Sequence, residues 1–60
     1  MANYYERDYW IKNALGKIPS TQPTFAGWRG GRKYYIVTFY DEPAKDYYID
    51  FDNRTIEEVT

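Results

Sequence analysis

Two carboxylates, Asp50 and Asp52, are the residues of this 60-residue chain whose types and spacing come nearest to chemistry. In an extended strand they would lie on one face, roughly 7 Å apart. A general acid–base pair needs a pocket around it, and a metal site needs more ligands than these two. The chain has no His and no Cys, so Ser20, its one serine, has no evident base. We therefore predict no enzymatic activity, no cofactor and no metal site.

A second group of side chains could bind a ligand without reacting with it. Residues 28–35, Trp-Arg-Gly-Gly-Arg-Lys-Tyr-Tyr, interleave cationic and aromatic side chains, as sites for single-stranded nucleic acids do. The isoelectric point near 5.2 and the carboxylates on the same predicted sheet oppose a phosphate backbone. Single-stranded nucleic-acid binding is the alternative function, and a hairpin turn flanked by solubilising charges explains the same residues.

Residues 33–40 and 46–52 predict two strands, because apolar or aromatic side chains recur at every second position of each segment. A loop over residues 41–45 would pair the strands with one apolar face, which we assign to the core, and one outer face. The pairs expected on the core face are Phe39 with Tyr47, Val37 with Ile49 and Tyr35 with Phe51. The pairs expected on the outer face are Tyr40 with Asp46, Thr38 with Tyr48, Ile36 with Asp50 and Tyr34 with Asp52.

The first quarter of the chain predicts a helix. Asn3 and Glu6 have the spacing of an N-terminal cap, and the apolar residues that follow recur with helical period. The helix is predicted over residues 4–15 and ends at Gly16, a residue type favoured just after a helix. Residues 16–23 are a connector rich in residues that break regular structure.

Gly30 and Gly31 predict a two-residue hairpin turn between residues 24–29 and the strand that follows. Residues 55–59 fit either a fourth strand or a helical turn. The pairs expected across the hairpin are Trp28 with Lys33 and Ala26 with Tyr35 on the core face, and Phe25 with Ile36 and Arg29 with Arg32 on the outer face.

The predicted fold is α+β, an N-terminal helix packed on one face of a three- to four-stranded antiparallel β-meander, in a single domain over residues 1–60. Packing must stabilise so small a domain without disulfides, and the 22% of aromatic residues supply buried area. The predicted core consists of Tyr4, Ile11, Leu15, Trp28, Tyr35, Val37, Phe39, Tyr47, Ile49 and Phe51.

The outer face is too aromatic for an ordinary solvated surface. Tyr and Arg are enriched in the hot spots of protein interfaces, and Phe25 opposite Ile36 would expose apolar area with no polar group. Aromatic and β-branched residues also suit strands for structural reasons alone. The predicted partner-binding residues are Phe25, Arg29, Arg32, Tyr34, Ile36, Tyr40 and Tyr48.

Charge is distributed unevenly along the chain. Residues 1–33 carry six Lys or Arg and two acids, a net charge of +4, whereas residues 34–60 carry two bases and seven acids, a net charge of −5. The two halves either neutralise each other within the fold or form a surface that orients a charged partner. No segment approaches the roughly 20 apolar residues of a membrane span, so we expect a soluble, cytoplasmic protein.

The C-terminal half resembles the PepSY family of small α/β modules. Phe51-Asp52-Asn53-Arg54-Thr55 matches the hydrophobic, Asp and Thr positions of that family's hydrophobic-Asp-x-x-Thr-Gly-x-Val signature. Ile56 stands where the family has Gly, and Val59 comes one residue late. The resemblance covers about residues 32–59 and implies a binding or peptidase-inhibitory role, usually outside the cytoplasm.

These observations favour a non-enzymatic protein-interaction module, an inhibitor or adaptor that occupies a partner's surface through the aromatic outer face. The partner is expected to be another protein or a second copy of the chain, because a 60-residue domain gains stability by forming a homodimer.

Overall fold

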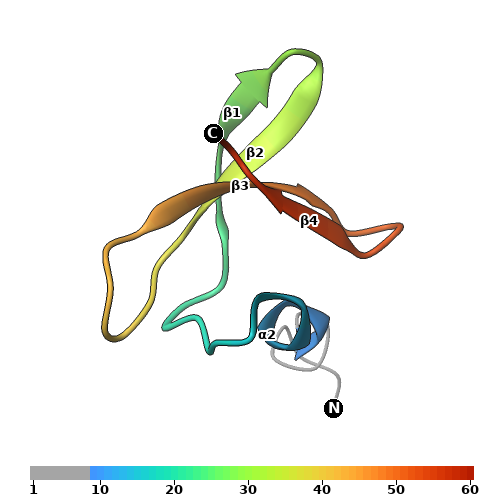
Figure 1. Cartoon of the computed structure of the whole chain (residues 1–60). Helices are drawn as coiled ribbons and strands as arrows, with labels where there is room; N and C mark the ends of the chain where they lie inside the picture. Colours follow the sequence, from blue (N-terminus) through green and yellow to red (C-terminus); the bar gives the residue numbers. More distant parts are fainter. Residues whose placement is uncertain (1–8) are drawn as a thin grey trace.

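The computed structural model describes residues 9–60, and in this range the fold is α+β, with one short helix and a four-stranded antiparallel sheet (Figure 1). The predicted meander is confirmed, and the last segment is a strand, not a helical turn. No helix in residues 9–60 combines the length and the hydropathy needed to cross a membrane. The elements in chain order are α2 (Tyr9–Leu15), β1 (Thr24–Arg29), β2 (Arg32–Val37), β3 (Lys45–Asp50) and β4 (Thr55–Glu58).

Helix α2 ends where the sequence predicts. Gly16 has a φ of 75°, and its N–H donates to the carbonyl of Lys12 at 2.9 Å, so the chain leaves the helix through a left-handed residue. The predicted start of the helix, with Asn3, Glu6 and the core candidate Tyr4, lies outside the described residues.

The core forms around five buried side chains, each at most 9% exposed: Ile11, Val37, Phe39, Tyr47 and Ile49. Trp10, Leu15, Tyr35, Phe51 and Ile56 pack against them while partly buried. The helix therefore supplies Ile11 to the cluster, and the Trp10 ring meets the Phe51 ring edge to face, with 6.2 Å between centroids.

The sequence predicts Trp28 in the core, and this prediction is wrong because the residue is 62% exposed. The β1–β2 hairpin reaches away from α2, so the end that carries Trp28 extends beyond the packed cluster (Figure 1). The ring still lies on the expected face, where the Lys33 ammonium stands 5.5 Å from its centroid.

The register predicted between β2 and β3 is also wrong. Tyr35 pairs with Tyr47 and not with Phe51, a shift of four residues, and all seven predicted pairs change accordingly. Because four is an even number, each side chain that lies within β2 or β3 keeps its predicted face. The observed pairs are Tyr34 with Tyr48, Tyr35 with Tyr47, Ile36 with Asp46 and Val37 with Lys45.

The connector explains why β2 ends at Val37. The N–H of Ser20 donates to the carbonyl of Thr38 at 2.8 Å, and Pro19 forms an isolated bridge with Phe39. The Ser20 hydroxyl also donates to the Thr38 hydroxyl at 2.9 Å. These contacts hold residues 38–39 on the connector side, so the chain turns back to β3 through a longer loop over residues 38–44.

A β-bulge interrupts the pairing of β1 with β2. Arg29 pairs with Arg32 as predicted, but the register shifts between Phe25 and Gly27, where Gly27 has a φ of 153°. Phe25 consequently pairs with Tyr35, and their rings meet edge to face at 5.6 Å between centroids. The outer-face position predicted for Phe25 is therefore wrong.

Candidate protein-binding surface

The outer face of the two central strands carries a compact group of four side chains, Arg32, Tyr34, Ile36 and Tyr48, which we call the outer patch. Tyr34 and Tyr48 lie opposite each other across β2 and β3, and both are half-buried. Ile36 is 39% exposed beside them and faces Asp46. The patch thus joins two amphipathic rings to an apolar side chain that reaches solvent.

The Arg32 guanidinium makes two contacts within and beside the patch. Its guanidinium carbon lies 4.0 Å from the centroid of the Tyr48 ring, and Nη2 donates to Glu57 Oε1 at 3.0 Å. Glu57 comes from β4, where it pairs with Tyr48. Stacking on an aromatic face and pairing with a carboxylate both suit the planar guanidinium, so the side chain is partly ordered before any partner binds.

The Arg32–Glu57 ion pair offsets the repulsion between two arginines that face each other across the hairpin. Arg29 lies opposite Arg32 at the end of the hairpin, as the sequence predicts. Like charges directly opposite destabilise a sheet, and the Glu57 carboxylate places an opposite charge beside them. Together with the Lys17–Glu42 pair at 2.8 Å, this contact joins the basic and acidic halves of the chain.

Tyr40, predicted on the outer face, lies in the loop after β2 and is 73% exposed. Its outer-face position is wrong because β2 ends before it. Tyr40 instead lines a separate hollow of about 410 Å³ with Tyr9 and Ile18, which are 44% and 55% exposed. Sequence reasoning missed this hollow, although Ile18 stands out as an apolar residue among the breakers of the connector.

Asp50 is the last residue of β3, and Asp52 lies in the turn that follows. Asp50 Oδ1 accepts the backbone N–H groups of Asp52 and Asn53 at 3.1 and 3.2 Å, and Oδ2 accepts the Asn53 side-chain amide at 2.9 Å. The Asp50 carboxylate therefore closes the β3–β4 turn.

These hydrogen bonds lower the pKa of Asp50 below its ordinary value, with the Asn53 side chain as the largest cause. A carboxylate that stays ionised near neutral pH is a poor general acid. In residues 9–60, no group of three or more His, Cys, Asp or Glu side chains could hold a metal ion.

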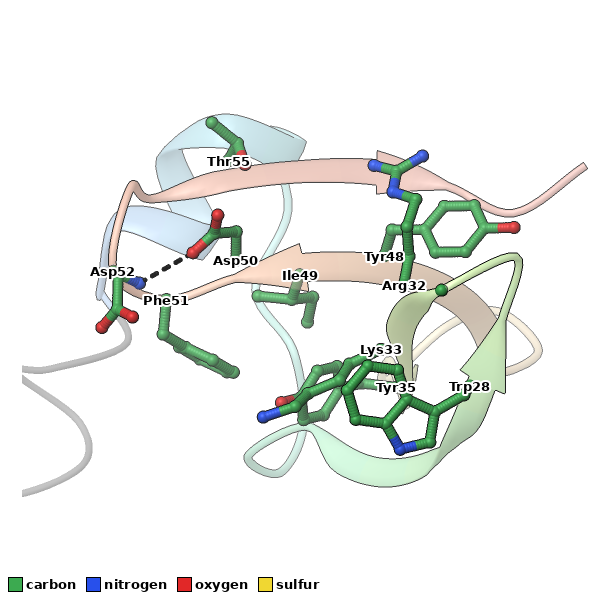
Figure 2. Close-up of a pocket in the computed structure, with 11 residues that line it drawn as sticks. Trp28, Arg32, Lys33, Tyr35, Tyr48, Ile49, Asp50, Phe51, Asp52 and Thr55 are labelled. Carbon is green, nitrogen blue, oxygen red and sulfur yellow. Dashed lines mark hydrogen bonds between the residues drawn. The ribbon is translucent and has the colours of Figure 1, made fainter.

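A cleft of about 490 Å³ opens where the two hairpins diverge, and no pattern in the sequence predicts it. The β2–β3 ladder stops at the pair Tyr34–Tyr48, so beyond it each hairpin continues as a separate arm. Figure 2 shows Trp28, Lys33 and Tyr35 on the β1–β2 arm, facing Phe51 and Asp52 at the turn of the β3–β4 arm. Arg32 and Tyr48 belong both to this cleft and to the outer patch.

No protein-family model, curated protein or solved structure matches this chain. The resemblance to the PepSY family therefore stays a prediction.

Proposed function

We propose that the protein is a non-enzymatic interaction module, an inhibitor or adaptor that covers a partner protein's surface with its outer patch. The observation that carries the proposal is Arg32, fixed between the Tyr48 ring and the Glu57 carboxylate beside the exposed Ile36. Ordering the side chain before binding lowers the entropy lost on association, so more of the contact energy appears as affinity.

The composition of the patch supports a protein partner. Tyr and Arg are the residue types that most often form hot spots, and here they surround an apolar side chain. Arg29 and Arg32 stand at the hairpin end of β2, and Asp46 lies opposite Ile36 farther along the face. Such a separation of charge would orient a partner with the opposite pattern.

Affinity capture with matched variants tests the proposal. The tagged wild type, a patch variant (Arg32→Gln with Ile36→Thr) and a control variant (Tyr40→Ser) are each incubated with extract of the source cells, and bound proteins are quantified by mass spectrometry. We expect one partner to be enriched by wild type and control and lost from the patch variant. A partner retained equally by all three would contradict the proposal.

The homodimer needs its own measurement, because a second copy of the chain would occupy the same patch. Sedimentation velocity over a hundredfold dilution distinguishes the cases. A monomer at all concentrations leaves the patch free for a foreign partner, whereas a dimer that Ile36→Thr dissociates would make the chain its own partner.

One observation favours single-stranded nucleic-acid binding as the second candidate. Trp28 is 62% exposed at the end of the hairpin, with Lys33 over its ring and Arg29 next to it in sequence. Fluorescence titration of single-stranded DNA and RNA at two salt concentrations separates the candidates. Tight binding that weakens steeply with salt and is lost in Trp28→Ala would favour the nucleic acid.

A further inference from the structure

The cleft between the two hairpin arms carries two charges of opposite sign that the fold leaves unpaired. Lys33 lies on the β1–β2 arm and Asp52 on the turn of the β3–β4 arm, and both line the cleft. In residues 9–60, neither side chain has an ion pair or a side-chain hydrogen bond, in contrast to Arg32 and Asp50 nearby. A ligand that spans the cleft could neutralise both charges at once.

The two walls of the cleft separate just beyond the last pair of the β2–β3 ladder, Tyr34 with Tyr48. Lys33 follows this pair on one wall and Ile49 on the other, and both residues line the cleft.

Aromatic side chains complete the lining of the cleft. The Tyr35 and Phe51 rings meet edge to face at 5.3 Å between centroids, and the exposed Trp28 ring lies toward the hairpin end. An apolar side chain of a ligand in the cleft would meet these rings, and Phe51 lies between Lys33 and Asp52 (Figure 2).

We propose that the cleft binds an extended peptide segment of the partner that carries an acidic side chain for Lys33 and a basic side chain for Asp52. This inference rests on the proposed function, because it names the part of a protein partner that enters beside the outer patch. A peptide fits better than a nucleic acid, because Asp50 and Asp52 in the lining oppose phosphate and because a peptide can carry side chains of both charges.

Titration with short blocked peptides tests the inference. The probes are acetylated, amidated peptides of the type Glu-Val-Thr-Val-Arg, with one, two or three residues between the charges, and controls with Gln in place of both charged residues. Binding is followed by the indole N–H of Trp28 and the amides of Lys33 and Ile49 in nitrogen–proton correlation spectra. We expect at least one charged spacing to bind about tenfold more tightly than its neutral control.

Charge reversal makes the test specific. Lys33→Glu or Asp52→Lys alone would give the two walls like charges and weaken binding of the charged peptide about tenfold. The double variant exchanges the two charges, so it should restore binding of a peptide whose acidic and basic residues are exchanged. Lys12→Glu and Glu58→Lys, which change charge outside the cleft, should bind as wild type does, and thermal melts confirm that each variant is folded.

Other outcomes overturn the inference. Equal affinity for charged and neutral peptides, or no rescue in the double variant, would exclude charge bridging across the cleft. Tighter and steeply salt-dependent binding of oligothymidine at the same amides would assign the cleft to nucleic acid. If no peptide binds but Ile36→Thr still abolishes partner capture, the cleft proposal fails while the proposed function stands.

Discussion

The ring of Tyr34 lies over Gly27, so closely that a Cβ built on Gly27 would stand 3.4 Å from Tyr34 Cε1. The two residues are paired across β1 and β2 at the bulge, where Gly27 has a φ of 153°. This backbone conformation is one that side chains with a Cβ rarely adopt. The bulge therefore both seats a tyrosine of the outer patch and turns Phe25 to the core face.

Replacing Gly27 tests the bulge. Gly27→Ala should lower the free energy of unfolding by about 1–3 kcal/mol, because alanine is strained at this φ. Urea unfolding measures the change, and Ala26→Ser, an exposed neighbour, should stay within about 0.5 kcal/mol of wild type. Equal stability of Gly27→Ala and wild type would mean that the bulge does not depend on glycine.

The buried ring of Phe39 should dominate the stability of the core. Phe39→Ala should cost about 3–5 kcal/mol by loss of packing and formation of a cavity, comparable to the whole stability of a small domain. Chemical unfolding measures this cost, with Phe25→Ala as the control because that ring is 51% exposed. If both substitutions cost the same, the two rings would be equally buried in solution, against the structure.

Acid should weaken the β3–β4 turn. The pKa of Asp50 is lowered in the folded state, chiefly by the Asn53 side chain, so its contribution to stability is present above the unfolded pKa near 3.8 and is lost as pH falls through the lower folded value. Thermal melts between about pH 5 and pH 2 should show a smaller loss of stability in Asp50→Ala than in wild type. An identical pH dependence of stability in both proteins would show that Asp50 is not the titrating group.

Arg54 offers a test in the stabilising direction. It is the one non-glycine residue in the described part of the chain with a positive φ, 57°, a conformation that costs residues with a Cβ about 1–2 kcal/mol. Arg54→Gly should raise the free energy of unfolding by about 0.5–1 kcal/mol after the larger entropy loss of glycine is subtracted. A lower stability would indicate that the Arg54 side chain contributes more than its backbone costs.

The strand faces could be predicted from the sequence, but their pairing could not. Period-two alternation assigns Val37, Tyr47 and Ile49 to the core whatever the register, and this prediction is confirmed. The register depends on contacts of Ser20 with Thr38, 18 residues apart, which no local pattern encodes.

Some residues of the candidate site could be predicted from the sequence and others could not. Arg32, Tyr34, Ile36 and Tyr48 share the predicted outer face because alternation alone puts them there. Phe25 and Tyr40 do not, since a one-residue bulge and an early strand end are small changes with large effects on side-chain direction. The cleft appears only when the divergence of the two hairpins is known.

The central claim is that the outer patch contributes to binding while the fold does not depend on it. The most direct measurement takes the patch variant, Arg32→Gln with Ile36→Thr, and records on one preparation its thermal midpoint and its affinity for the captured partner. We predict a cooperative melt close to that of wild type and an affinity lower by at least about 2 kcal/mol, roughly thirtyfold. An unfolded variant, or a folded one that binds as tightly as wild type, would contradict the claim.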